Sequence, residues 1–319
     1  MNLFNDVPKI ELHLHLDGSL NINSISKRYN KPIDELKSMM VADHKCTNLN
    51  DYLTKFDYPI SIMQTKEELS SALIELLNTL KSQNVIYSEI RFAPQFHTKK
   101  GLTQDEVVRT LIDAKNSVDI KSNLILCFMR GSDEDANRET LEVAKKYFNK
   151  GVCAVDLAGA EALFKTSMYE SLFKDVKAAG LNYTIHAGEA DGVESIRSAI
   201  KFGAKRIGHG VRAIEDKELL KEIKEKGITL EICPTSNIQT CICTDYTNHP
   251  ITDLYNYGIK VTINTDNMTV SDTNLDNEYI KLVNNTSLNI QDIINMNINS
   301  INASFLSEEE KDDLRKKFK

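Results

Sequence analysis

Two histidines end the first apolar run of the sequence, KIELHLH at residues 9–15. His13 and His15 are separated by one leucine, so on a β-strand their side chains point to the same face. A buried imidazole without a partner is unfavourable, and neutral imidazole is a good ligand for divalent metals. The pair therefore indicates a metal site, with a hydrogen-bonded pair in the core as the alternative interpretation.

The remaining ligands of such a site follow later apolar runs. His186 lies in YTIHAGE at residues 183–189, and Asp266 ends KVTINTD at residues 260–266. Three imidazole nitrogens and one carboxylate oxygen suit zinc and leave a further position for a water molecule. We therefore expect one catalytic zinc ion bound by His13, His15, His186 and Asp266.

Two residues close to these ligands could move protons. Glu189 follows His186 by three residues, and a poorly solvated carboxyl beside a metal can stay protonated near neutral pH and act as a general acid. The alternative is a first-turn acid on the next helix. His209, flanked by glycines in RIGHG, could orient or deprotonate the attacking water, or be a structural histidine in a turn. Asp266 could accept a hydrogen bond from the same water.

These residues need a scaffold that brings distant segments together, and the sequence predicts one made of parallel strands. Helical patterns at 102–118, 135–150 and 216–227 separate short apolar runs, and Gly227 is a plausible end for the last helix. Alternating strands and helices indicate parallel βαβ units. The predicted strands are 9–15, 85–94, 124–130, 153–159, 183–189, 206–210, 229–237 and 260–266.

Eight such units are the number in a closed barrel. We therefore predict an α/β fold, a (β/α)8 TIM-type barrel with a helical insertion after the first strand, at residues 16–84, and a helical C-terminal tail, at 267–319. The alternative is an open doubly wound sheet, but no GxGxxG motif follows the first strand. Active-site groups of such barrels lie at the C-terminal ends of strands, where the residues above are found.

The composition limits the classes of function. The chain has 319 residues, 41% of them hydrophobic, and no low-complexity linker, so we expect a single domain over residues 1–319. A net charge of −7 with scattered lysines argues against a nucleic-acid groove, and no signal-peptide pattern or run of 18 apolar residues indicates export or a membrane span. The six cysteines have neither disulfide nor zinc-site spacing, which favours a reducing cytoplasm. The sequence does not specify an oligomeric state.

The motifs taken together resemble the adenosine deaminases of the amidohydrolase superfamily. The resemblance rests on ELHLHLDGS, VDLAGAE, TIHAGE, RIGHG, CPTSNIQT and INTDN, in this order, and spans residues 8–279. It implies that Glu189 protonates the purine ring nitrogen next to carbon 6 and that His209 positions and deprotonates the attacking water. It also implies that the four predicted ligands hold one zinc ion.

The same resemblance implies contacts to a nucleoside. Gly159 matches a glycine whose backbone N–H meets a purine nitrogen, and Asp17 matches the residue that bonds the ribose 5′-hydroxyl. Many members have a second aspartate after the metal-binding one; here Asn267 stands in its place and can still donate a hydrogen bond to the purine. The expected substrate-binding residues are Asp17, Gly159, Asn267, His15, Leu49, Tyr52, Leu53 and Phe56.

The last four of these form a predicted hydrophobic lid. Leu49, Tyr52, Leu53 and Phe56 are spaced i, i+3, i+4 and i+7, so they share one helix face. Such a stripe usually packs on a core. The segment LNDYLTKFD resembles the one that forms a hydrophobic lid over the nucleoside in this family, and an apolar lid that excludes water is consistent with that use.

The implied activity is the hydrolytic deamination of adenosine and 2′-deoxyadenosine to inosine or 2′-deoxyinosine and ammonia, a step of purine salvage. Free adenine or another 6-aminopurine is the nearest rival substrate. A barrel that binds nucleoside or metal without turnover and a metal-dependent esterase or phosphotriesterase are the other readings. A cytidine-deaminase type of site is excluded because H-x-E and P-C-x-x-C are both absent.

Overall fold

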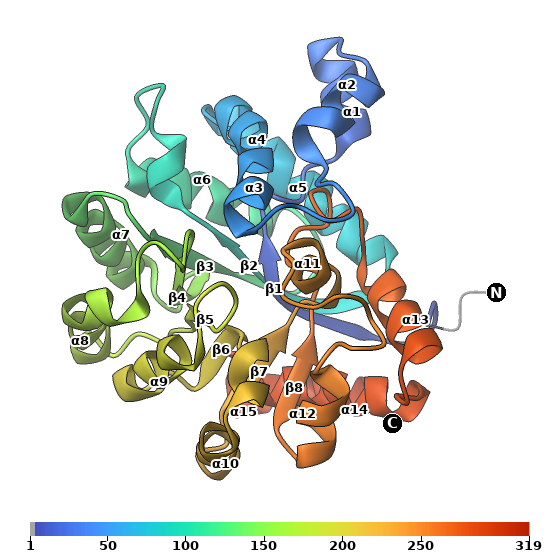
Figure 1. The fold of residues 1–319 in the computed structure, drawn as a ribbon. Helices are drawn as coiled ribbons and strands as arrows, with labels where there is room; N and C mark the ends of the chain where they lie inside the picture. Colours follow the sequence, from blue (N-terminus) through green and yellow to red (C-terminus); the bar gives the residue numbers. More distant parts are fainter. Residues whose placement is uncertain (1–3, 319) are drawn as a thin grey trace.

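The computed structural model describes residues 4–318 and has an α/β architecture in which all paired strands are parallel (Figure 1). Two four-stranded sheets have the strand orders β1-β2-β3-β4 and β5-β6-β7-β8. The strands are β1 Lys9–His15, β2 Val85–Phe92, β3 Ser122–Met129, β4 Val152–Ala158, β5 His186–Ala187, β6 Arg206–His209, β7 Thr229–Ile232 and β8 Lys260–Ile263.

Single bridges lie at the two seams between the sheets. One parallel bridge pairs Leu14 of β1 with Asp266 after β8, and another pairs Val155 of β4 with Tyr183 before β5. At the first seam the backbone N–H of His15 donates to the carbonyl of Asp266 over 2.7 Å, and the N–H of Asp266 donates to the carbonyl of His13 over 2.9 Å. The first and last predicted site segments are therefore tied together through the backbone.

All eight predicted strands overlap an observed strand, but five are shorter than predicted, three of them by three residues or more. The segment 183–189 forms only the two-residue β5. Strand β7 ends at Ile232, because Pro234 begins helix α11, Pro234–Gln239; proline lacks the N–H that a strand needs and suits the first turn of a helix. Strand β8 ends at Ile263, before the turn that carries Asp266.

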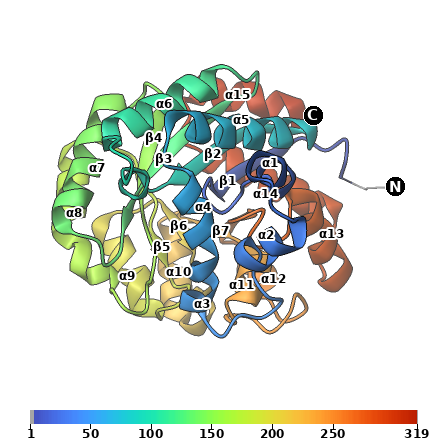
Figure 2. The ribbon, with the colours of Figure 1, turned by 90° about the horizontal axis from the view of Figure 1, so that it is seen from above.

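The predicted insertion after β1 is helical. It consists of α1 Ile22–Tyr29, α2 Ile33–Met40, α3 Leu49–Leu53, the short 3₁₀ helix η1 Thr54–Phe56, α4 Asp57–Ile62 and α5 Lys66–Ser82. Figure 2 shows α1 to α4 gathered on one side of the molecule. Helix α5 buries leucines at 69, 73, 76, 77 and 80, an amphipathic spacing that packs it on the strands.

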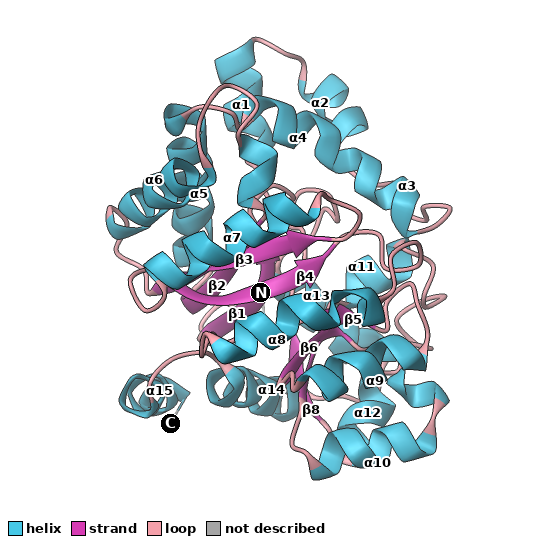
Figure 3. Ribbon diagram, turned by 90° about the vertical axis from the view of Figure 1, so that its left-hand side faces the viewer, coloured by secondary structure: helices cyan, strands magenta, loops and turns pink. Residues whose placement is uncertain are grey.

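Further helices surround the strands (Figure 3). They are α6 Gln104–Asn116, α7 Glu134–Tyr147, α8 Glu170–Ala178, α9 Val193–Phe202, α10 Lys217–Glu225, α12 Ile251–Tyr257 and the tail helices α13 Leu275–Asn285, α14 Ile290–Ala303 and α15 Glu308–Arg315. Gly227 adopts φ = 62° just after α10 and ends that helix as predicted. Among the described residues no helix is both long and apolar enough to cross a membrane. The cytoplasmic location stays a prediction.

Buried charged side chains connect strands of the two sheets. Arg91 donates to Asp156 over 2.7 Å and to Glu231 over 2.8 Å. Arg206 donates to the other oxygen of Glu231 over 2.6 Å and also pairs with Glu89. Burial would raise the pKa of Glu231, but the two guanidinium charges outweigh it and hold this pKa well below its usual range. We call these five residues the ion-pair layer.

Candidate active site

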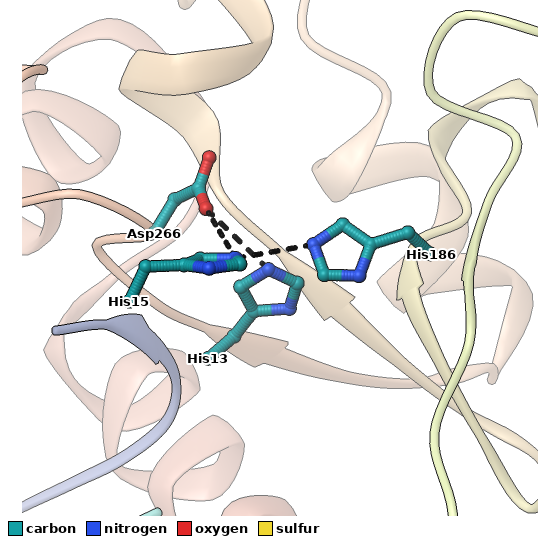
Figure 4. Close-up of side chains that lie close together, drawn as sticks. All are labelled: His13, His15, His186 and Asp266. Carbon is teal, nitrogen blue, oxygen red and sulfur yellow. Dashed lines mark hydrogen bonds and ion pairs between the residues drawn. The ribbon is translucent and has the colours of Figure 1, made fainter. Parts of the chain in front are cut away.

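The four predicted metal ligands converge on one point (Figure 4). His13 and His15 come from the end of β1, His186 begins β5, and Asp266 lies in the turn after β8. The Nε2 atoms of His15 and His186 are 3.3 Å apart, and Asp266 Oδ1 lies 3.5 Å from the Nε2 atoms of both His13 and His15. The ligand atoms of all four residues lie within 4.8 Å of one another, so the structure brings together the set expected from the sequence.

The spacing of these atoms fits a tetrahedral metal ion. Bonds of about 2.0–2.1 Å place neighbouring tetrahedral ligands about 3.3–3.4 Å apart, close to the separations observed. His13 Nε2 is buried and forms no hydrogen bond within the described residues, so it is available for coordination. A second set, His13, His209, Cys233 and Asp266, also lies within 4.8 Å. Burial raises the pKa of the Cys233 thiol, however, which disfavours the thiolate that binds a metal.

Two carboxylates of the ion-pair layer orient the histidines. His13 Nδ1 lies 2.8 Å from Glu231 Oε2, and His186 Nδ1 lies 2.9 Å from Asp156 Oδ2. A carboxylate at Nδ1 holds the proton there and leaves the Nε2 lone pair facing the site. Sequence reasoning missed Glu231; its only signal was a glutamate in the middle of a buried strand, TLEI.

Glu189 and His209 lie beside the ligands. Both are buried, and Glu189 Oε2 is 3.6 Å from His209 Nε2. Burial, followed by the charges of Asp266 and Glu161, raises the pKa of Glu189 well above its usual value, which favours the protonated form that a general acid needs. Burial lowers the pKa of His209, and the imidazole is neutral.

Two site residues have an uncommon backbone conformation. His209 has φ = 59° and Asp266 has φ = 60°, both in the left-handed region that residues other than glycine rarely adopt. His209 is the last residue of β6 and Asp266 lies three residues after β8, where this turn of the backbone directs the side chain towards the site. Such conformations are often found at functional sites.

Glu161 anchors the loop that carries Glu189, and sequence reasoning did not single it out. Its buried carboxylate accepts hydrogen bonds from the backbone N–H groups of residues 188, 189, 190 and 191, over 2.7, 3.0, 2.6 and 3.0 Å, and from the Ser195 hydroxyl. Five donors to one carboxylate fix the path of the loop and hence the position of Glu189. The signal in the sequence was the acid of the VDLAGAE motif.

A cavity of about 410 Å³ opens next to these groups. Its size is in the range of small-molecule pockets. The residues that line it include every predicted substrate contact: His15, Asp17, Leu49, Tyr52, Leu53, Phe56, Gly159 and Asn267. Glu189, His209 and Asp266 line it as well, so proton-transfer groups and predicted binding residues face one space.

The predicted lid is α3 with η1, and its apolar stripe both packs on a small core and lines the cavity; its closing over a nucleoside stays a prediction. Leu49 and Tyr52 are buried and belong to a cluster with Ala42, Cys46 and Val270. The same stripe, including Leu53 and Phe56, faces the cavity. The lid therefore packs on a small core of its own while presenting an apolar surface to a ligand.

Unpaired polar atoms lie at the other side of the cavity. The amide of Asn267 donates to Tyr52 Oη over 3.0 Å, whereas its Oδ1 forms no hydrogen bond within residues 4–318. Asp17 Oδ1 is also buried without a partner there, and burial raises the pKa of Asp17 to about 7. Gly18 permits this arrangement, because a Cβ at this position would lie 1.9 Å from Asn267 Oδ1. A ligand would satisfy these atoms.

Comparisons with known proteins agree over almost the whole chain. The family model described as adenosine deaminase matches residues 8–319. An adenosine deaminase of Haemophilus ducreyi is 43% identical over 320 residues, covering 95% of this chain and 93% of its own.

Solved structures share the fold. The crystal structure of an adenine deaminase from Arthrobacter aurescens matches with a TM-score of 0.87 at 25% identity and covers 98% of both chains. An amidohydrolase from Burkholderia ambifaria, solved with bound Zn, has a TM-score of 0.85 at 22% identity and covers 99% of this chain and 90% of its own. At 22% identity, the similarity to the amidohydrolase shows only that the two chains share a fold.

Proposed function

The chain belongs to the adenosine deaminase family, and from this premise we propose that it hydrolyses adenosine and 2′-deoxyadenosine to inosine or 2′-deoxyinosine and ammonia. The observation that carries the proposal is the convergence of three imidazoles and one carboxylate beside the buried Glu189, whose pKa is raised, at the wall of a partly apolar cavity. This arrangement combines a metal site, a general acid and space for a purine nucleoside.

We further propose that the metal is one zinc ion held by His13, His15, His186 and Asp266. The donor set of three nitrogens and one oxygen and their tetrahedral spacing support zinc. When bound, the ion supplies Lewis acidity that lowers the pKa of a water molecule and polarises it for attack.

The chain's own residues would then carry the protons. Glu189 donates its proton to the ring nitrogen next to carbon 6, which makes that carbon more electrophilic. His209 and Asp266 flank Glu189 and position the attacking water against carbon 6. The proton that the attacking water gives up passes to the amino group, the carbon–nitrogen bond to that group breaks, and ammonia leaves. The oxygen stays on carbon 6, and its remaining proton returns to Glu189.

The residues that line the cavity support a nucleoside as the substrate rather than a free base. Asp17, with its unpaired Oδ1, would accept a hydrogen bond from the ribose 5′-hydroxyl. Gly159 would donate its backbone N–H to the purine, and Asn267 would meet the five-membered ring. The lid stripe would cover the base and exclude water.

The two sheets, we infer, close into one (β/α)8 barrel within a single domain. The backbone bridges at both seams support closure. Helices on the outside of the strands and site residues at the strand ends also fit this architecture.

The test is ammonia release by the zinc-loaded protein from adenosine, 2′-deoxyadenosine, adenine and cytidine. We expect kcat/KM for both purine nucleosides to exceed that for adenine by at least about 100-fold, since losing the sugar removes the contact to Asp17. Adenine as the better substrate would overturn the assigned substrate. Tight nucleoside binding without ammonia would indicate a binding protein instead.

A further inference from the structure

Behind the cavity, His209 is the first of three buried side chains in a row. Asn237 of α11 lies with its Nδ2 3.0 Å from His209 Nδ1. His249, just before α12, lies with its Nε2 3.3 Å from Asn237 Oδ1. The backbone N–H of Ile251 donates to His249 Nδ1 over 3.1 Å and ends the row. The motif CPTSNIQT supplies Asn237, but no role follows for it or for His249 from the metal site alone.

The hydrogen bond at the far end of the row fixes which atoms along it donate and which accept. A backbone N–H can only donate, so His249 Nδ1 must accept the bond from Ile251. Burial lowers the pKa of His249 to about 3, so the ring is neutral at pH 7 and has one proton. That proton must therefore be on Nε2, which faces Asn237.

The proton position of His249 also fixes the orientation of the Asn237 amide. Because His249 Nε2 donates, the atom opposite it must be the amide oxygen, and the NH₂ group then faces His209. The reversed amide would set N–H against N–H at His249. Nδ1 of His209 consequently accepts a hydrogen bond, and the single proton of this neutral ring is on Nε2.

We propose that Asn237 and His249 are positioning residues that hold His209 as the Nε2–H tautomer, so that its ring offers the attacking water a hydrogen-bond donor and not a base. The inference rests on the proposed deaminase function. His209 Nε2 is 3.6 Å from Glu189 and faces the cavity that Asp266 also lines. The proton of the water then needs another acceptor in the same cavity, and the Asp266 carboxylate, which lines it, is the group in position to take it.

A second buried histidine provides an internal control. His97 lies outside the residues that line the cavity, and its Nδ1 is 2.9 Å from the carbonyl oxygen of Met63. A carbonyl only accepts, so the neutral His97 ring must carry its proton on Nδ1. The protein thus contains buried histidines of opposite tautomer, each fixed by a backbone group.

Long-range ¹H–¹⁵N correlation NMR of the zinc-loaded, ¹⁵N-histidine-labelled protein tests the proposal directly. We expect His209 and His249 to be Nε2–H tautomers and His97 to be the Nδ1–H tautomer in the same spectrum. A His209 ring protonated on Nδ1, on both nitrogens, or mixed would overturn it. The readout does not depend on turnover, so it can fail while ammonia is released, or hold while no ammonia is released.

Substitution of Asn237 connects the tautomer to catalysis. In Asn237→Asp an ionised carboxylate replaces the donor, so His209 should switch to Nδ1–H. A wrong tautomer at a catalytic histidine costs roughly 10⁴-fold in serine proteases, and we expect kcat with adenosine to fall by roughly 10²–10⁴-fold. If the ring switches and kcat stays near wild type, the tautomer has no catalytic role and the proposal is wrong.

Two substitutions at His249 distinguish the effect of its hydrogen bonds from the effect of its size. Glutamine offers an NH₂ group and an oxygen at its end, so His249→Gln can donate to Asn237 and accept from Ile251. His249→Leu fills similar space with neither group. We expect His249→Gln to keep the Nε2–H signal of His209 and kcat within about tenfold of wild type, and His249→Leu to lose both. Equal behaviour of the two variants would contradict the relay, and His97→Gln reports the effect of losing an unrelated buried histidine.

Discussion

The interior of this protein holds two polar regions that differ in how completely they are paired. In the ion-pair layer, Arg91 and Arg206 share the carboxylates of Glu89, Asp156 and Glu231 over short distances. In the ligand layer, our name for the four predicted metal ligands together with the residues that line the cavity, the described structure leaves polar atoms without partners. Among these atoms are His13 Nε2, Asp17 Oδ1 and Asn267 Oδ1.

The difference distinguishes residues that support the fold from residues that are available to bind a ligand. Buried polar atoms are normally paired, and each unpaired one is costly. The unpaired atoms of the ligand layer are therefore retained for a ligand. In the ion-pair layer only Arg91 Nε lacks a hydrogen bond among the described residues, and the paired charges fix the strands. The layers meet at Glu231–His13 and Asp156–His186, so the supporting charges also orient two metal ligands.

The largest expected effect lies in the ligand layer. In Glu189→Gln the amide keeps the shape of the side chain but cannot protonate the purine. We expect kcat with adenosine to fall by roughly 10²–10⁴-fold, while the zinc content measured by mass spectrometry stays at one per chain. Activity near wild type would remove Glu189 from the mechanism, and loss of zinc would move its role to the metal site.

Breaking the ion-pair layer should instead affect stability. Arg91→Met leaves Asp156 and Glu231 without their shared cation, and we expect the free energy of unfolding in urea to drop by about 3–5 kcal/mol. The matched control is Arg138→Met on the surface, where the pair with Asp175 should be worth less than about 1 kcal/mol. Similar losses in both variants would show that the layer gives no special support.

Acid should destabilise the protein through a histidine of neither layer. Burial lowers the pKa of His97 from 6.5 to about 4, so its contribution to stability is complete above pH 6.5 and is lost as the pH falls through about 4. Between pH 7.5 and 4 the wild type should lose about 3 kcal/mol more unfolding free energy than His97→Gln. Parallel pH curves for the two proteins would contradict the buried, neutral ring.

The smallest effect should come from the anchor of the Glu189 loop. In Glu161→Gln an NH₂ group replaces one accepting oxygen and opposes backbone N–H groups. We expect kcat to fall by roughly 10–100-fold with the zinc content unchanged. Glu194→Gln, at an exposed position of the next helix, should leave kcat unaltered. A Glu161→Gln enzyme with normal kcat would show that the loop keeps its path without this carboxylate.

The sequence predicted the residues of the ligand layer better than the residues that hold them in place. His13, His15, His186 and Asp266 were found because each lies at the end of an apolar run and strand ends share one side of a parallel fold. Glu231 and Glu161 were missed because their partners are far apart in sequence or are backbone N–H groups. The predicted strand 229–237 was too long. Only one residue separates the end of β7 from helix α11, which begins at Pro234 and carries Asn237.

The most direct test of the account is anomalous diffraction at the zinc edge from crystals of the zinc-loaded protein. We predict one peak at about 2.0–2.2 Å from the Nε2 atoms of His13, His15 and His186 and from an oxygen of Asp266. A peak bonded to Cys233 and His209, or no peak among these side chains, would contradict the central claim that the four ligands hold the catalytic ion.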